Sequence, residues 1–145
     1  MTYATRADIE ARFGKVNVET WANLDNADPD APEVAGEITA RIDRAIEVAT
    51  ARIDDAFRGS RFKVPLEPTA GNQLVGITEV CAALAGTWLY ESRGIDEQDE
   101  DGRPFNRLAT HRRWAERQIG RYLREVERMP AQTVIDGPRA PFIVG

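Results

Sequence analysis

Apolar residues recur at helical spacing along three long stretches of the chain. Over residues 38–57 they lie three or four positions apart and mark one face of an amphipathic helix. Over residues 74–89 the same spacing recurs, and further apolar residues widen the stripe until most of the helix surface is apolar. This predicts a central helix. A third stripe begins near Pro104, where proline suits the first turn of a helix, and stops before Pro130. The pattern therefore predicts three long helices.

A fourth, short helix is predicted close to the N-terminus. Thr5 is a candidate N-cap, Asp8 follows three positions later, and Gly14 can close the last turn. Beyond it, residues 15–36 are rich in aspartate, asparagine and proline, which favour turns, so a long acidic loop is expected. Residues 94–103 form the second expected acidic loop, between the second and third long helices.

The segment RGSRFKVPLEP, residues 58–68, interrupts the helical pattern. Gly59 ends one helix, and two prolines prevent another from beginning before about residue 69. We expect Phe62 and Val64 to anchor this corner on the core and its basic residues to stand at the rim. Of these, Arg61 is the residue expected to bond across an interface. The basic candidates for contact with another protein are Arg58, Arg61 and Lys63.

These elements predict an all-α fold. Residues 1–129 are expected to form one small helical bundle, with three long helices and one short N-terminal helix, and residues 130–145 an extended C-terminal arm. The arm ends on an apolar tripeptide, Phe142, Ile143 and Val144. This tripeptide can pack on its own domain or on a neighbouring chain, and the pattern favours neither.

Composition narrows the class of protein. With 145 residues, of which 42% are hydrophobic and 30% charged, the chain is expected to fold as one ordinary globular domain. A net charge of −5 argues against a surface built throughout to grip phosphate backbones. The one cysteine, Cys81, cannot form an intrachain disulfide, and no apolar run approaches the roughly 20 residues of a membrane span. A cytoplasmic protein without signal peptide or membrane contact is expected.

Catalytic and metal-binding patterns are weak. His111 is the only histidine, which excludes a histidine-rich metal cluster. The acidic run over residues 96–101 places carboxylates at the first, third and fifth positions of a calcium loop, but Leu108 occupies the twelfth, where a bidentate carboxylate is required. A solvated charge run is the favoured interpretation. We therefore expect no enzyme activity, no metal and no cofactor.

The last predicted helix carries a row of arginines opposite its apolar stripe. Eight arginines and three glutamates lie between residues 103 and 128. A solvated face with pairs to Glu116 and Glu125, an acidic patch on a neighbouring protein, and nucleic acid each explain such a row, and all three stay open. The row, called the basic ridge below, consists of Arg113, Arg117, Arg121, Arg124 and Arg128.

Three stretches in order resemble a known family. They are YATRADIEARFG near the N-terminus, AIEVATARIDDAFRGSRFKVPL in the middle, and VCAALAGTWLY after it. Together they resemble the small head-to-tail joining proteins of Mu-type tailed phages over most of residues 2–94. The matching landmarks are Phe13-Gly14, Ile53-Asp54, Arg61-Phe62 and Pro65-Leu66. The chain departs from the family in having Phe62 where tyrosine is usual and a longer acidic loop after Asp25.

The resemblance implies a structural virion protein without enzymatic activity. Such an adaptor assembles as a homo-oligomeric ring beneath the portal protein, lets DNA pass through its centre with transient, non-specific contact, and offers a surface to the next neck or tail protein. It is found in the virion neck, and in the host cytoplasm during assembly. Candidates for the subunit or portal interface are then Arg58, Arg61, Lys63, Phe142, Ile143 and Val144. The alternative is a cytoplasmic helical DNA-binding or regulatory module that uses the basic ridge.

Overall fold

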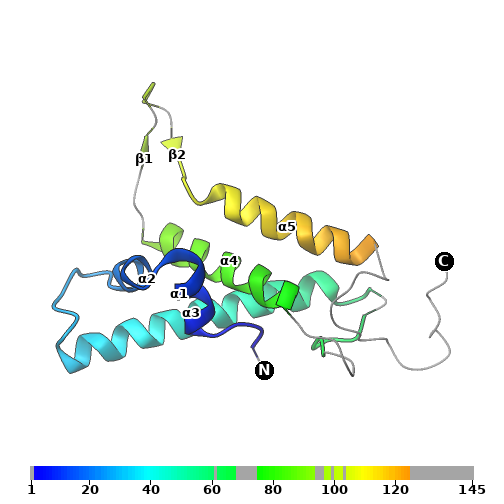
Figure 1. The fold of residues 1–145 in the computed structure, drawn as a ribbon, viewed down its shortest axis with the longest axis horizontal. Coiled ribbons are helices and arrows are strands. Elements are labelled where there is room, and N and C mark those ends of the chain that lie inside the picture. The colour runs from blue at the N-terminus through cyan, green and yellow to red at the C-terminus, as the bar shows by residue number, and fades with distance from the viewer. Residues whose placement is uncertain are drawn as a thin grey trace.

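The described part of the chain is a bundle of five helices with a small β-ribbon (Figure 1). The computed structural model describes residues 2–60, 62–67, 75–93, 97–98, 100–102 and 104–124. In chain order the elements are α1 (Arg6–Phe13), α2 (Lys15–Ala22), α3 (Pro32–Phe57), α4 (Val75–Ser92), β1 (Glu97–Gln98), β2 (Pro104–Phe105) and α5 (Ala109–Arg124). The all-α prediction is confirmed, and the predicted arm over residues 130–145 lies outside the described residues.

The short helix α1 begins as its sequence predicts. The side chain of Thr5 accepts a hydrogen bond from the backbone N–H of Asp8, and the Asp8 carboxylate accepts one from the backbone N–H of Thr5 at 2.7 Å. This reciprocal capping box satisfies two N–H groups that the first turn leaves without helical partners. At the other end Gly14 has a φ of +91°, a conformation that disfavours any side chain.

The predicted long loop over residues 15–36 is wrong. Helix α2 occupies Lys15–Ala22 and α3 already begins at Pro32, so the loop is confined to residues 23–31. Val18 and Ala22 lie one turn apart on the buried face of α2, which packs against α1, α3 and α4. Because a helix of two turns is marginal by itself, these tertiary contacts stabilise it, and local sequence preference does not show them.

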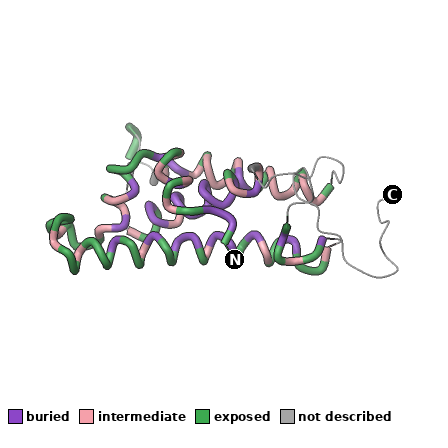
Figure 2. The backbone as a smooth tube through the Cα atoms, turned by 60° about the horizontal axis from the view of Figure 1, so that its bottom comes forward, coloured by how far each residue is buried: buried purple, intermediate pink, exposed green. Residues whose placement is uncertain are grey.

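Helix α4 is the centre of the bundle, as predicted. It contacts each of the other four helices of the described chain, and the side chains from Val80 to Ala85 are buried all round it. Figure 2 shows the buried positions gathered where the helices meet. Gly86 allows a close approach on this helix, and the approaching group is the ring of Phe13. A Cβ at Gly86 would lie 2.1 Å from Cε2 of Phe13.

Helix α5 starts later than predicted. Pro104 and Phe105 belong to β2, which pairs antiparallel with β1, and the ribbon projects away from the helices (Figure 1). The helix begins only after Asn106, whose side-chain oxygen accepts a hydrogen bond from the N–H of Leu108 at 2.9 Å. Asparagine favours such a local bond just ahead of a helix, and Pro104 is paired in β2, so the first turn starts only at Ala109.

Candidate functional site

The corner after α3 is fixed firmly to the core. The hydroxyl of Tyr3 donates to Asp54 of α3 at 2.5 Å and accepts from the backbone N–H of Leu66 at 2.7 Å. Burial is the main cause that raises the pKa of Tyr3, and its bond to Asp54 adds to the shift, so the phenol stays protonated. The ring of Phe62 is buried and meets Phe57 edge-on, with ring centroids 5.5 Å apart.

The expected anchors of this corner are confirmed in part. Phe62 is buried as predicted, whereas Val64 is only half-buried. Arg58 and Lys63 are exposed at the rim, and Arg58 forms an ion pair with Asp55 of α3. Arg61, the residue expected to bond across an interface, lies outside the described residues, as do Phe142, Ile143 and Val144.

The basic ridge lies on the outer surface of α5. Its four members within the described chain are exposed, and none of them forms an ion pair with a described residue. Glu116, a predicted partner of the ridge, pairs instead with Arg52 of α3 at 3.4 Å. The exposed members of the ridge are Arg113, Arg117, Arg121 and Arg124, while Arg128 and Glu125 fall outside the described residues.

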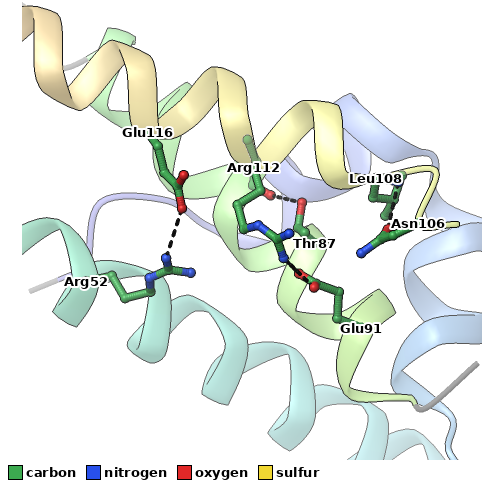
Figure 3. A network of polar contacts seen from close by, with 8 residues as sticks. Arg52, Thr87, Glu91, Asn106, Leu108, Arg112 and Glu116 are labelled. Carbon is green, nitrogen blue, oxygen red and sulfur yellow. Dashed lines mark hydrogen bonds and ion pairs between the residues drawn. The ribbon is translucent and has the colours of Figure 1, made fainter. Parts of the chain in front are cut away.

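A groove separates α3 from α5 and has α4 as its floor. Its hollow of about 300 Å³ is lined by residues that include Arg52, Thr87, Trp88 and Arg112. Figure 3 shows two ion pairs beside it: Arg52 of α3 with Glu116 of α5, and Arg112 of α5 with Glu91 of α4. In each ion pair the two charges neutralise each other. The two pairs therefore link α5 to α3 and α4 beside the groove.

Arg12 ties α1 to the other side of α5. Its guanidinium lies 4.6 Å from the ring centroid of Trp114, forms an ion pair with Glu79 of α4 at 3.2 Å, and approaches Nδ1 of His111 at 3.3 Å. A guanidinium only donates, so Nδ1 accepts when the imidazole is neutral. Partial burial, and then the charge of Arg12, lower the pKa of His111. His111 is half-buried on α5, and its ring packs edge-on against Phe13.

The loop over residues 23–31 presents carboxylates at one end of the molecule. Asn23 shapes it, because its side chain donates to the carbonyl of Ala27 at 2.8 Å and accepts from the N–H of Ala27 at 3.2 Å. Asn26 has a positive φ of 50°, which asparagine tolerates better than most residues. The acidic end, as we call it, consists of the exposed side chains Asp25, Asp28, Asp30 and Glu33. None of these carboxylates pairs with a described cation.

Cys81 is buried in the core. Burial is the main cause that raises the pKa of its thiol to about 11, and its sulfur contacts Oγ1 of Thr50 at 3.6 Å. A thiol with so high a pKa carries little thiolate near neutral pH and is a poor nucleophile. Over the described ranges, no three His, Cys, Asp or Glu side chains are placed to hold a metal ion.

Comparison with protein families decides the identity of the chain. The model of the family described as Bacteriophage Mu, Gp36 matches residues 3–110, about three quarters of the sequence. The chain belongs to this family. It is therefore a bacteriophage protein, and the resemblance to a Mu-type phage family is confirmed. No curated protein shows significant similarity to it.

The Gp36 match reaches further than the resemblance over residues 2–94, and it stops two residues into α5. The capped helix α1, the corner and the central helix all lie inside it, whereas the basic ridge lies beyond its end. In the described part of this family member, no helix is both long and apolar enough to span a bilayer.

Several features of the site were missed from the sequence. The helix α2, the contacts of Arg12 and the ion pair between Arg112 and Glu91 were not predicted. One signal was present: Arg112 is the only polar residue in the apolar stripe of the last helix, a position at which a cation needs a partner. Which residue supplies that partner depends on the packing of α5 against α4.

Proposed function

We propose that the chain is a structural virion protein that joins the phage head to the tail. Several copies form a ring between the portal protein and the next neck or tail component, and DNA passes through its centre without enzymatic chemistry. The observation that carries the proposal is membership of the Bacteriophage Mu, Gp36 family over residues 3–110, together with ordered motifs that resemble those of head-to-tail joining proteins. The virion neck is the proposed location, reached from the host cytoplasm during assembly.

The geometry supports a building role. The corner is held between α3 and the N-terminus by Tyr3 and Phe62, so Arg58 and Lys63 project from a rigid base. A rigid, charged rim suits a contact that sets the angle between neighbouring subunits, because complementary charges fix register more than affinity. The net charge of −5 also suits a DNA conduit, since each added phosphate contact would hold DNA that must move.

The test is association with the portal protein of the same phage. The two purified proteins are mixed and followed by sedimentation velocity, and particle necks are imaged with the chain labelled. We expect a joint species containing both proteins, and density for the chain directly beneath the portal. If the two proteins sediment separately and the label is missing from the neck, the adaptor proposal is wrong.

A second function rests on the basic ridge. Four exposed arginines along one helix face could bind the DNA backbone, which would make the chain a helical DNA-binding or regulatory module. Fluorescence anisotropy with duplex DNA at moderate salt distinguishes the two functions. Substantial affinity that is lost when Arg117, Arg121 and Arg124 are changed to alanine would favour the module over the adaptor.

A further inference from the structure

Ion pairs inside the molecule use most charged residues of α1, both of those on α4, and four of the nine on α3. They link the helices to one another or brace a single helix, and the described pairs are Arg6 with Glu10 and Glu19, Arg12 with Glu79, Arg44 with Glu47, Arg52 with Glu116, Arg58 with Asp55, and Arg112 with Glu91. Two surfaces stand apart from this pairing. One is the basic ridge of α5 and the other is the acidic end between α2 and α3.

The basic ridge is uniformly positive over the described part of α5. Arg113, Arg117 and Arg121 follow one another at intervals of four, and like charges at this spacing repel across one helical turn. With a rise of about 1.5 Å per residue, the row from Arg113 to Arg124 extends roughly 16 Å along the helix. An acidic surface of similar extent, placed over this row, would relieve the repulsion and neutralise several charges at once.

The acidic end combines charge with exposed apolar side chains. Val16 on α2 is 75% exposed and Leu24 in the loop is 45% exposed, and they are the large hydrophobic residues most open to solvent among those described. Leu24 directly precedes Asp25, whereas Val16 lies in the first turn of α2 next to Lys15. The carboxylates of the acidic end number four, as many as the exposed arginines of the ridge. Apolar side chains bordered by charge are typical of a protein contact surface, and the partner that fits this one is basic.

We infer that the basic ridge of one copy docks on the acidic end of a second copy. Figures 1 and 2 both place the acidic end at one extremity of the molecule and the last turns of α5 toward the other. A contact between two different surfaces leaves the acidic end of one joined copy and the ridge of the other still open, so the contact repeats from copy to copy. Each copy thereby contacts the next through the same two surfaces. The row of copies closes into a ring if the rotation between neighbours allows it. This inference deepens the proposed adaptor function and names the surfaces that its ring would use.

The test uses the full chain in sedimentation velocity at low and high salt. We expect self-association at low salt that weakens as salt is raised, because exposed charge pairs are screened. One variant reverses the ridge with Arg117→Glu and Arg121→Glu, and a second reverses the acidic end with Asp28→Lys and Asp30→Lys. Each variant alone should dissociate at least about tenfold more readily than the unaltered chain.

Mixing the two variants is the decisive step. The reversed ridge of the first complements the reversed acidic end of the second, and the unaltered surfaces also match, so an equal mixture should regain association. The control exchanges the exposed pair on α3 by Arg44→Glu and Glu47→Arg, which keeps the net charge and should change nothing. Circular dichroism verifies that every variant is folded, and the milder pair Arg117→Gln and Arg121→Gln should weaken association less than reversal does.

Failure of this inference is distinguishable from failure of the adaptor proposal. A chain that stays monomeric at low salt, or whose assembly ignores both reversals, or whose variants do not rescue each other, overturns the docking of ridge on acidic end. DNA binding that depends on the ridge, without self-association, overturns it as well. A chain that assembles with itself by these surfaces yet ignores the portal protein contradicts the adaptor function and leaves the docking intact.

Discussion

At the scale of single residues, close packing determines which side chain a position tolerates more than helix preference does. The ring of Phe13 lies against Gly86 of α4, and the same ring meets Trp21 and His111 edge-on, with centroids 5.6 and 4.9 Å apart. One aromatic side chain thus joins α1, α2, α4 and α5. The glycine is required by the ring, because any side chain on α4 at that position would occupy the same space.

Gly86→Ala is expected to destabilise the protein although alanine is the better helix former. The added Cβ would lie 2.1 Å from Cε2 of Phe13, and overpacking of this kind typically costs about 1–3 kcal/mol. Denaturant unfolding measures the change. Gly36→Ala on α3 is the matched control, because its Cβ would meet nothing within 4 Å, and it should be neutral or stabilising. Equal effects of the two substitutions would contradict the packing argument.

His111 makes the free energy of unfolding depend on pH. Its folded-state pKa lies below its ordinary value, so as the pH falls through about 6.5 the unfolded state takes up the proton first. As the pH falls from about 7 to the lowered pKa of the folded state, the free energy of unfolding should therefore decrease. Above this pH window the contribution of His111 to stability should be fully present. Unfolding followed at several pH values checks this. His111→Gln should flatten the profile there, since the chain has no other histidine, and an unchanged slope would contradict the assignment.

At the scale of the elements, hydrogen bonds and ion pairs fix the positions of segments relative to one another, which helix preference alone does not determine. Tyr3 joins the N-terminal segment, α3 and the corner after it through its bonds to Asp54 and Leu66. Helix α5 is held on α4 by the pair of Arg112 with Glu91. A half-exposed pair of this kind contributes about 0.2–1 kcal/mol, so the packing of the apolar face of α5 remains the larger contribution.

Tyr3→Phe is expected to loosen the corner. The substitution removes the hydroxyl that bonds to both Asp54 and Leu66. The Asp54 carboxylate and the N–H of Leu66 each lose this hydrogen bond, which should lower the free energy of unfolding by about 1–3 kcal/mol. Tyr90→Phe is the matched control. The hydroxyl of Tyr90 is buried without a hydrogen-bond partner among the described residues, so its removal should be neutral or stabilising. Thermal unfolding of the two variants compares them, and a larger loss for Tyr90→Phe would refute this reasoning.

At the scale of the whole molecule, the bundle is organised around one helix. The other described helices lie around α4, with the exposed arginines of the basic ridge along α5 and the carboxylates of the acidic end between α2 and the start of α3. The projecting β-ribbon and the outer face of α5 belong to the periphery. A molecule of this kind has a rigid centre and edges able to make contacts, which agrees with a role as a building unit.

Amide hydrogen exchange should reflect this organisation. The backbone of α4 at Ala82, Ala83 and Ala85 is buried on every side, so its amides should exchange only when the whole molecule unfolds. Amides in the last turn of α5, near Arg121 and Arg124, should exchange much faster because these two residues are exposed and helix ends fray. Exchange measured by mass spectrometry tests this order. Protection in α4 no higher than at the end of α5 would show that α4 is not the centre of stability.

The sequence by itself determined the features that depend on near neighbours. The cap at Thr5, the stripes of α3 and α4, and the break at Gly59 follow from spacing and backbone preference, and they are confirmed. The all-α class and the exposed ridge on α5 follow in the same way. Of the predicted corner residues, Arg58 and Lys63 are found at the surface, and Arg61 lies outside the described residues.

Only the tertiary structure decided which distant residues meet. Helix α2 exists because Val18 and Ala22 are buried by other helices. The partner of Glu116 is Arg52, on another helix, although arginines on its own helix were available. The formation of α2 and the partner of Glu116 both depend on contacts between residues far apart in sequence. These contacts form only when the helices pack together. The same packing determines which charges are neutralised within the molecule and which remain available to a partner.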